Sequence, residues 1–369
     1  KEGQKEETMP SEPWLIYGAY GYTGTLVAEE AVRRGYRPVL AGRSADRLAV
    51  LAKRLELEYR ASSLQDEEAL SRALAGFKLV FHAAGPFVHT SGPMVRACLK
   101  AGAHYVDICG EAPVIERSFS YDVEARQKGI VILSGAGFDV IPTDCLAKYV
   151  ADRVPGATEL ELAVAALGRL SPGTVKTILE QIPSGTRVLR NGRLVGYHPE
   201  GKGARRIRFV DKERPVAPVS MADLIAAYRT TGIPNITTYL AFPETTIRLM
   251  RWTEPLSRNL LAVGPIRRLA QKTAGKIVRG PDEPTRLAGG SHLWARAAND
   301  KGEEAEAWLE TVEAYRFTSM AAVRCVERVL EERPCGALTP AQAFGADFVL
   351  QIPETKRYDR LEEVSTGSA

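Results

Sequence analysis

The sequence has no long hydrophobic run, few cysteines and little excess charge, and each absence excludes a class of protein. No apolar stretch reaches the ~18–20 residues that a helix needs to cross a bilayer, and no secretory leader is expected. The five cysteines are odd in number and show no CxxC spacing, which predicts reduced thiols in a cytoplasmic protein. The five histidines form no HExxH or HxxxH pair, so no metal site is predicted. A net charge of +4 over 369 residues is too mild to indicate a nucleic-acid-binding protein.

What the chain does have is length and enough apolar residues for two hydrophobic cores. At roughly 150 residues per domain, 369 residues correspond to about two domains. Hydrophobic residues make up 45% and charged residues 25% of the chain, which is typical of a folded protein. The polar first twelve residues, 1–12, are predicted to be a mobile arm outside the fold.

The first part of the chain alternates short apolar runs with amphipathic stretches, a pattern typical of a parallel sheet with crossover helices. The apolar runs predict six strands, at 14–17, 38–41, 58–61, 78–83, 104–107 and 130–133. This number is enough for a complete dinucleotide-binding sheet. We therefore predict an α/β fold with a Rossmann-type domain over residues 13–145.

After Pro142 the pattern changes to strands joined by tight turns. The pair Asn191-Gly192 is a strong two-residue hairpin sequence, and 292–298 and 304–311 are expected to form another strand pair. Hairpins imply an antiparallel sheet, so residues 146–315 are predicted to be an inserted α+β domain for substrate binding or dimerisation. Residues 316–369 are predicted to form C-terminal helices that pack back on the Rossmann domain.

A glycine-rich loop lies directly between the first predicted strand and the first predicted helix. Gly18 permits a tight turn, Gly21 lets a pyrophosphate approach the backbone, and Gly24 allows the helix to pack closely on the strand. The N-terminus of the helix then offers free N–H groups and a positive dipole end to phosphates. A structural turn is the alternative. The residues predicted to contact the cofactor here are Gly18, Tyr20, Gly21, Tyr22, Thr23 and Gly24.

The end of the second predicted strand indicates which dinucleotide is bound. NAD-binding domains carry an acidic residue there, whereas this chain has Arg43, about 20 residues after Gly24. An arginine grips a 2′-phosphate through two hydrogen bonds, and Ser44 and Arg47 lie close enough in sequence to assist. The cofactor is therefore predicted to be NADP(H). The loop Ala84-Gly85-Pro86 closes the fourth strand and is expected beside the same cofactor, although a plain Gly-Pro turn would explain it equally well.

Several sequence blocks resemble the saccharopine-dehydrogenase-like NADP-binding oxidoreductases, a group that includes trans-acting enoyl reductases. The blocks are 15–24, 41–44, 84–87, 101–111, 135–144, 228–235 and 339–345. The resemblance implies a Rossmann domain with a substrate domain inserted before a C-terminal segment that returns to it. It also implies hydride transfer between NADPH and a small-molecule or carrier-bound substrate. The full set of polar residues by which saccharopine reductases bind an amino acid is not matched.

Three residues are candidates for the chemistry beyond hydride transfer. Glu111 follows the fifth predicted strand and Asp139 follows the sixth, where a carboxyl group with a raised pKa could relay a proton. Tyr228, in the second domain, could donate a proton from its phenol. The alternatives are structural: a helix cap for Glu111 and core packing for Tyr228. No Ser/His/Asp or Cys/His arrangement is present, so nucleophilic catalysis is not expected.

A basic amphipathic stretch at residues 248–279 contains eight basic residues and one acid, Glu254. Pro255 and Pro265 are expected to break it into short helices. It could be a flap over the substrate domain, or dock an acidic carrier protein, a CoA phosphate or an anionic membrane surface.

The function predicted from these features is an NADP(H)-dependent oxidoreductase that reduces a carbonyl, imine or enoyl group. A trans-acting enoyl reductase on acyl-carrier or CoA thioesters is the second hypothesis. A non-catalytic NADP-binding scaffold or membrane-surface adaptor is the third. The expected localisation is cytoplasmic, with peripheral membrane contact left open, and a homodimer is compatible with the sequence.

Overall fold

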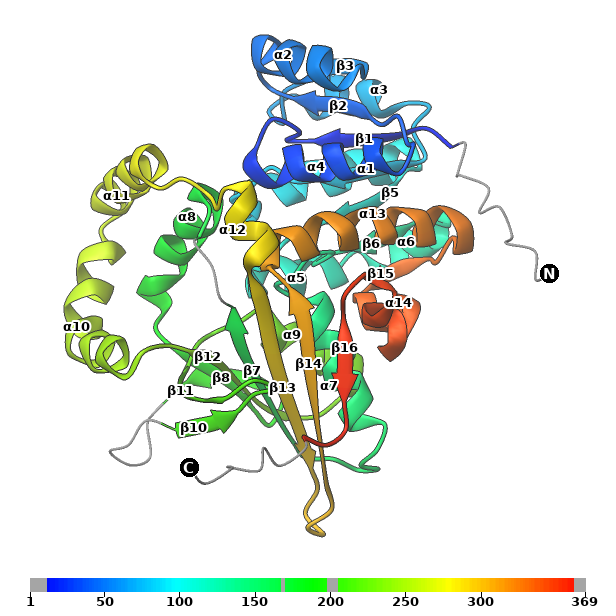
Figure 1. Ribbon diagram of the computed structural model, residues 1–369. Coiled ribbons are helices and arrows are strands. Elements are labelled where there is room, and N and C mark those ends of the chain that lie inside the picture. Colours follow the sequence, from blue (N-terminus) through cyan, green and yellow to red (C-terminus); the bar gives the residue numbers. More distant parts are fainter. Residues whose placement is uncertain (1–11, 167–169, 198–204, 362–369) are drawn as a thin grey trace. The chain divides into compact units, whose positions relative to one another are not determined.

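The computed structural model describes residues 12–166, 170–197 and 205–361, which divide into two compact units (Figure 1). Unit 1 contains the described residues up to 109 together with 113–137 and 318–338. Unit 2 contains 110–112, 138–317 and the described residues from 339 onward. The predicted mobile arm lies outside the described residues, apart from Glu12.

Unit 1 is built on a sheet of seven parallel strands in the order β15-β6-β5-β4-β1-β2-β3. The strands are β1 (Trp14–Tyr17), β2 (Val39–Gly42), β3 (Tyr59–Ala61), β4 (Leu79–His82), β5 (His104–Asp107), β6 (Val131–Leu133) and β15 (Gly336–Leu338). The connecting helices are α1 (Tyr22–Arg33), α2 (Ala45–Leu55), α3 (Glu67–Leu74), α4 (Phe87–Ala101), α5 (Ala112–Phe119) and α6 (Asp122–Lys128). The six strands predicted from the sequence are present, and β15 is a seventh that the sequence analysis missed.

The core of unit 1 follows from the two-residue period of its strands. Leu15, Val80, Tyr105 and Ile132 are paired across neighbouring strands, and all four are buried. Side chains of α4, including Met94, complete the same cluster. Because these side chains share one face of the sheet, a shift of any strand by one residue would expose its apolar set. The register is therefore fixed by burial.

Unit 2 contains a nine-stranded sheet that is mixed rather than purely antiparallel. Its main path runs β10-β11-β12-β7-β13-β14-β16, and β8 pairs with β12 and β9. The strands are β7 (Glu159–Ala166), β8 (Arg187–Arg190), β9 (Arg193–Gly196), β10 (Arg205–Arg208), β11 (Glu213–Pro218), β12 (Asn235–Ala241), β13 (Gly290–Ala298), β14 (Glu304–Val312) and β16 (Lys356–Tyr358). The hairpins predicted at Asn191-Gly192 and between β13 and β14 are confirmed. The expectation of a wholly antiparallel sheet is corrected, because β7 and β12 pair in parallel.

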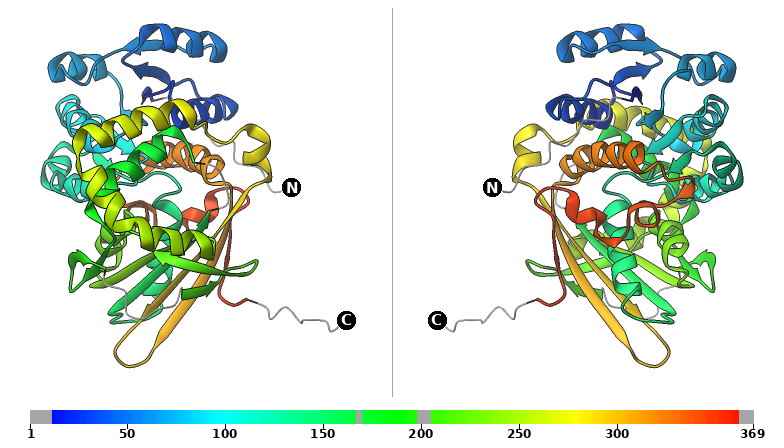
Figure 2. Two further views of the ribbon diagram at one scale, coloured as in Figure 1. Left: turned by 90° about the vertical axis from the view of Figure 1, so that its left-hand side faces the viewer. Right: turned by 90° about the vertical axis from the view of Figure 1, so that its right-hand side faces the viewer.

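The helices of unit 2 are α7 (Ile141–Ala151), α8 (Pro172–Gln181), η1 (Ile182–Ser184), α9 (Asp223–Thr231), α10 (Glu244–Ala262), α11 (Gly264–Ile277), α12 (Glu283–Ala288), α14 (Pro340–Phe344) and η2 (Ala346–Gln351). In unit 2, helices α7 and α9 pack on the sheet, whereas α8, α10 and α11 pack mainly on one another and on η1 (Figure 2). Helix α7 packs on β13, β14, α9 and η2 and belongs to unit 2, whereas the predicted boundary after residue 145 falls inside it. Pro255 does not break its helix: α10 continues through it, and the interruption falls just before Pro265.

The C-terminal part of the chain is divided between the two units. Most of helix α13 (Ala314–Glu332) and strand β15 join unit 1, whereas residues from 339 onward join unit 2. In unit 2, β16 pairs with β14. Residues 316–369 are predicted to pack on the Rossmann domain, but only 318–338 belong to unit 1. Strands β15 and β16 divide this segment between the two units. Each has three residues, too few to show a hydrophobic period in the sequence.

Candidate functional site

The glycine loop of unit 1 has a geometry that only glycine permits. Gly18 has φ +84°, and a β-carbon there would lie 2.8 Å from the backbone nitrogen of Ala84. A β-carbon on Gly24 would collide with the carbonyl oxygen of Gly18. The start of α1 is thus drawn tightly onto the end of β1, as expected for a dinucleotide-binding turn.

The first turn of α1 is open to an anion. Gly21 occupies the N-cap position, no side chain caps the helix, and its first turn contains no acidic residue. The predicted contact residues Tyr22 and Thr23 form that turn. A helix N-terminus whose N-cap residue has no side chain, together with the helix dipole, favours a phosphate at this position.

Residues at the end of β2 provide cations beside this loop. Arg43 is exposed, and none of the ion pairs seen among the described residues engages it. The Tyr20 ring packs on Gly42, where a β-carbon would lie 2.7 Å from Cε1. The Arg47 guanidinium lies 4.4 Å from the centre of the Tyr20 ring and donates to the Tyr20 carbonyl at 3.3 Å. Ser44 caps α2 by accepting the Arg47 N–H at 3.5 Å, so part of its role is structural.

The loop after β4, predicted to lie beside the cofactor, is in contact with the glycine loop. The β-carbon position of Gly18 faces both the nitrogen and the β-carbon of Ala84. The Thr90 hydroxyl donates to the Ala84 carbonyl at 2.7 Å and holds the loop on α4. Gly85 and Pro86 follow at the start of α4, where Pro86 is the N-cap. The structure therefore gathers the predicted cofactor residues of three strand ends in one unit.

The buried side chains of His82, Tyr105 and Asp107 form a polar network close to these loops, which the sequence did not predict. The Tyr105 hydroxyl donates to Asp107 Oδ2 at 2.7 Å and lies 3.1 Å from His82 Nδ1. Asp107 Oδ1 accepts the N–H groups of Cys109 at 2.9 Å and Gly135 at 3.0 Å. Burial raises the pKa of Asp107 and lowers that of His82 to about 3. Asp107 therefore ties together the loops after β5 and β6, a structural role.

Glu111 and Asp139, the two carboxylate candidates, belong to unit 2. Glu111 is buried and has a partner, consistent with a structural role as well as a chemical one. Asp139 packs against Gly110, where a β-carbon would lie 2.7 Å from Oδ2. Asp139 is exposed, and desolvation by the surrounding chain raises its pKa to about 6. A carboxyl group with this pKa can hold a proton close to neutral pH.

Tyr228 lies on a different part of unit 2 from Asp139. Its hydroxyl packs on the β8–β9 hairpin, where a β-carbon on Gly192 would lie 2.8 Å away. Other residues of α9 lie against α7. The Thr230 hydroxyl, near the end of α9, donates to Asp144 on α7 at 2.5 Å, and Asp223, at the start of α9, is fully buried. The structure thus does not bring the Tyr228 hydroxyl to Asp139, and its catalytic role stays a prediction.

Asp144 is more than a first-turn acid of α7. Besides the Thr230 hydroxyl, it accepts the backbone N–H of Ala341 at 2.8 Å. Burial raises its pKa to about 6, against the lowering effect of these hydrogen bonds. Burial and the nearby carboxylates also raise the pKa of Asp223. These acids connect α7, α9 and α14 within unit 2.

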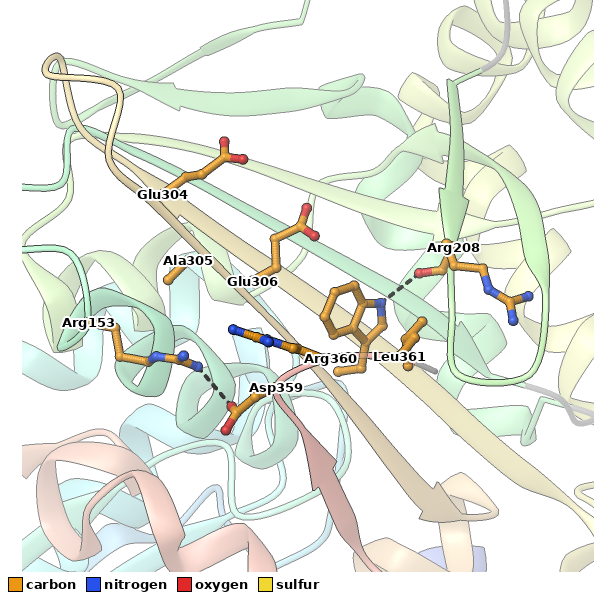
Figure 3. Close-up of a pocket in the computed structure, with 9 residues that line it drawn as sticks. Arg153, Arg208, Glu304, Ala305, Glu306, Asp359, Arg360 and Leu361 are labelled. Carbon is orange, nitrogen blue, oxygen red and sulfur yellow. Dashed lines mark hydrogen bonds and ion pairs between the residues drawn. The ribbon is translucent and has the colours of Figure 1, made fainter. Parts of the chain in front are cut away.

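A surface pocket of about 610 Å³ lies on unit 2 but contains none of the candidate residues (Figure 3). Arg153 forms an ion pair with Asp359 at 2.8 Å, and the Trp308 indole donates to the Arg208 carbonyl. Glu304, Glu306 and Arg360 complete a lining of mixed charge. Among the described residues there is no cluster of three or more His, Cys, Asp or Glu side chains able to hold a metal ion.

Comparison with known proteins identifies the first domain. Residues 14–133 match the family model "Saccharopine dehydrogenase NADP binding domain". This segment is therefore similar to the saccharopine dehydrogenase NADP binding domains. This match agrees with the prediction of NADP as the cofactor, and the exposed Arg43 at the end of β2 is consistent with it.

Relatives of the saccharopine-dehydrogenase type match more of the chain. A saccharopine dehydrogenase-like oxidoreductase from Mus musculus is 25% identical over 71% of this chain and 64% of its own length. The chain thus aligns with less than two thirds of that relative. A trans-acting enoyl reductase from Mycobacterium bovis is 25% identical over 92% of this chain and 95% of its own length.

The fold prediction is confirmed by a solved structure. The apo form of a saccharopine dehydrogenase (L-Glu forming) from Saccharomyces cerevisiae superimposes with a TM-score of 0.60, covering 94% of this chain and all of that one. At 12% identity this likeness concerns the fold alone. No helix in the described parts of the chain is long and apolar enough to span a membrane.

Proposed function

We propose that this protein is an NADPH-dependent reductase that transfers hydride to a carbonyl, imine or enoyl group of a small-molecule or carrier-bound substrate. The observation that carries the proposal is the combination, in one unit, of the tight glycine turn after β1 and the exposed Arg43 at the end of β2. The family of residues 14–133 and the oxidoreductase relatives support it.

The residues present fit an NADP molecule. Gly18 and Gly24 let the turn after β1 close tightly against its neighbours, and the start of α1 then presents its N-terminal end to a phosphate. Arg43 and Arg47 would hold the 2′-phosphate, and the Tyr20 ring would lie beside them. When bound, the reduced cofactor supplies a hydride to the substrate carbon. The neighbouring oxygen, nitrogen or carbon of the substrate must then gain a proton.

Asp139 is our proposed proton donor. It follows β6, and ligands of open α/β sheets bind at the carboxyl ends of the strands. Because of its raised pKa, Asp139 is protonated in a fraction of the molecules near neutral pH. It can therefore release a proton to the substrate and take up another from solvent. Gly110 provides the space that its carboxyl group occupies. Glu111 and Tyr228 remain candidates for positioning the substrate or donating the proton.

Replacing Arg43 tests the cofactor assignment. Arg43→Ala should weaken NADPH binding roughly 10- to 100-fold, because a charge-assisted pair with the 2′-phosphate is lost. NADH binding should hardly change. Isothermal titration calorimetry with NADPH and with NADH measures the two affinities. Arg72→Ala, at an exposed arginine of the same unit, is the control. Equal loss for NADPH and NADH, or no loss, would contradict the proposed role of Arg43.

Replacing Asp139 tests the proton donor. If Asp139 delivers the proton, the single-turnover rate should fall as pH rises past about 6, where the group loses its proton. Asp139→Asn should be slower and lack this pH dependence, whereas Asp152→Asn, at an exposed site, should keep it. An unchanged pH profile in Asp139→Asn would assign the proton to another group.

A trans-acting enoyl reductase is the second candidate. The enoyl reductase from M. bovis aligns with nearly the whole chain, which favours an enoyl thioester as substrate. NADPH oxidation should be followed with enoyl-CoA, ketone and imine substrates in parallel. Turnover only with enoyl thioesters supports this candidate, and turnover only with ketones or imines excludes it. Tight NADPH binding without turnover of any of these substrates would favour a non-catalytic NADP-binding protein.

A further inference from the structure

Helices α10 and α11 of unit 2 expose an unusual number of large apolar side chains. We call this surface the α10–α11 face, and its exposed apolar residues are Leu249, Trp252, Leu256, Leu260, Val263, Ile266, Leu269 and Ile277. Trp252 is 89% exposed, Ile277 73% and Leu256 71%. Single exposed apolar residues are common on protein surfaces, but a contiguous group of this size marks an interaction site.

The spacing of these residues places them on one side of each helix. Leu249, Trp252, Leu256 and Leu260 follow intervals of three, four and four residues, which form a single stripe along α10. The buried apolar residues of α10, including Ile247, lie on the opposite side. On α11, the spacing of Ile266, Leu269 and Ile277 gives a second stripe on one side of that helix.

The inner sides of both helices are already held by unit 2. Gln271 on α11 donates to the Lys176 carbonyl at 3.2 Å and to the Glu180 carboxylate at 2.7 Å. Arg258 on α10 donates to the Pro183 carbonyl at 3.1 Å. Helix α8 thus lies along α11, and η1 contacts α10 (Figure 1). Both helices thus already pack on unit 2 through their inner sides. The exposed apolar stripes are not needed for packing within this unit.

Unneutralised cations accompany the apolar stripes. Arg268, Lys272 and Arg279 are exposed, and no ion pair seen in the described part of the chain engages them. The spacing of Arg268 and Lys272, four residues apart, puts them on one edge of α11. By contrast, Arg267 faces inward and pairs with Glu180 at 3.5 Å. The face therefore combines apolar stripes with a positively charged border.

We propose that the α10–α11 face docks the protein on the surface of an anionic phospholipid membrane. Leucine, isoleucine and tryptophan side chains would enter the boundary between head groups and acyl chains, and the cations would contact anionic head groups. Tryptophan is enriched at this boundary in membrane proteins. Neither helix is apolar enough to cross the bilayer, so both would lie on it.

The charges and the apolar area argue for lipid over the two alternative occupants. A second copy of the chain would bring the same cations against one another, which costs energy in a symmetric contact. An acidic carrier protein would match the cations but would leave several large apolar side chains to a polar surface. An anionic membrane satisfies both parts of the face.

Vesicle flotation of the full chain tests the proposal without reference to its enzymatic activity. Vesicles of phosphatidylcholine with about 30 mol% phosphatidylglycerol should carry the protein, and vesicles of phosphatidylcholine alone should bind at least about tenfold less. Raising the salt concentration from about 0.1 M to about 0.5 M should release much of the bound protein. Binding should also shift the tryptophan fluorescence to the blue, and Trp252→Phe should abolish this shift, because Trp14 and Trp294 are buried already and the half-buried Trp308 lies outside the α10–α11 face.

Paired variants separate the two parts of the face. Leu256→Ser with Leu260→Ser removes exposed apolar groups and should reduce binding at least about tenfold; Val123→Ser, at another exposed site, is the control. Arg268→Glu with Lys272→Glu should have a similar effect, whereas Lys301→Glu should not. All positions are exposed, so folding, followed by circular dichroism, should be unaffected.

Three results would overturn the proposal. The first is failure of the wild-type chain to float with anionic vesicles. The second is a dimer in light scattering that dissociates in the Leu256/Leu260 variant while vesicle binding is absent. The third is salt-dependent binding of an acidic carrier protein to this face without any binding of vesicles.

Discussion

His82 is a buried titratable residue directly below the glycine loop. It is fully buried, and its Nδ1 lies 3.1 Å from the Tyr105 hydroxyl. Burial lowers its pKa from 6.5 to about 3, a change that the backbone of Ala84 only partly opposes. The imidazole is therefore neutral in the folded protein across the physiological range. A neutral ring can share a hydrogen bond with Tyr105 and hence support Asp107.

This shift predicts a specific pH dependence of stability. Above pH 6.5 His82 is neutral in both states, and as pH falls toward 3 only the unfolded chain gains its proton, so stability is lost. Between pH ~7.5 and ~5 the wild type should lose about 2 kcal/mol more of its unfolding free energy than His82→Gln. Urea unfolding at both pH values measures this, with the exposed His89→Gln expected to follow the wild type. Parallel losses in wild type and His82→Gln would show that His82 is not the titrating group.

At the scale of single elements, helix α10 shows how context overrides local preference. Proline lacks the N–H that would bond to the carbonyl four residues earlier, and its ring crowds that turn. This rule predicts a break at Pro255, yet α10 spans Glu244–Ala262. The helix is anchored on both sides of the proline, by Ile247 in the core and by Arg258 on Pro183. Tertiary contacts therefore hold a turn that the sequence disfavours. Pro265, in the first turn of α11, violates no such rule.

Replacing the two prolines should separate these effects. Pro255→Ala should stabilise α10 locally by about 1–3 kcal/mol, because an intrahelical hydrogen bond is restored. Hydrogen exchange of the α10 amides should slow by roughly 10- to 100-fold, and Pro265→Ala should leave the α11 amides nearly unchanged. Equal protection changes in the two variants would show that Pro255 carries no strain.

At the scale of the whole molecule, a late segment of the chain completes unit 1. Strand β15 pairs with β6, and Ala337 joins the core cluster of the first half. Glu327 on α13 is buried and accepts hydrogen bonds from Arg34, 293 residues earlier in the chain, and from Arg324. Unit 1 therefore needs residues 318–338, and the two units are interleaved along the sequence.

Removing this long-range contact should destabilise unit 1 measurably. Glu327→Ala leaves Arg34 partly buried with one fewer partner and should cost about 2–3 kcal/mol of unfolding free energy. Glu332 forms an ion pair with Arg328, but its carboxylate is exposed to solvent. Glu332→Ala should therefore cost at most about 1 kcal/mol of unfolding free energy. Urea denaturation of the two variants compares these costs. A cost for Glu327→Ala no greater than that for Glu332→Ala would place the link elsewhere.

The cofactor-binding part of this protein could be predicted from its sequence because its determinants are close together in the chain. Gly18, Gly24 and Arg43 act through a strand, a turn and a helix that follow one another, and the required spacing is visible in the sequence. The six main strands and the two hairpins were likewise encoded by local patterns. The match of residues 14–133 to an NADP-binding family agrees with this assignment.

Other features depend on residues that are distant in sequence, and only the tertiary structure decided them. These are the pairing of β15 with β6, the parallel pair β7–β12, the contact of Asp139 with Gly110, and the hydrogen bonds that Thr230 and Ala341 donate to Asp144. In each case the stabilising contact forms only when segments far apart in the chain are packed together, so no local period records it. Sequence alone thus determined the glycine turn after β1 and the exposed arginine at the end of β2. Packing between distant segments decided which carboxyl groups are buried with raised pKa values and which helices leave an apolar face exposed.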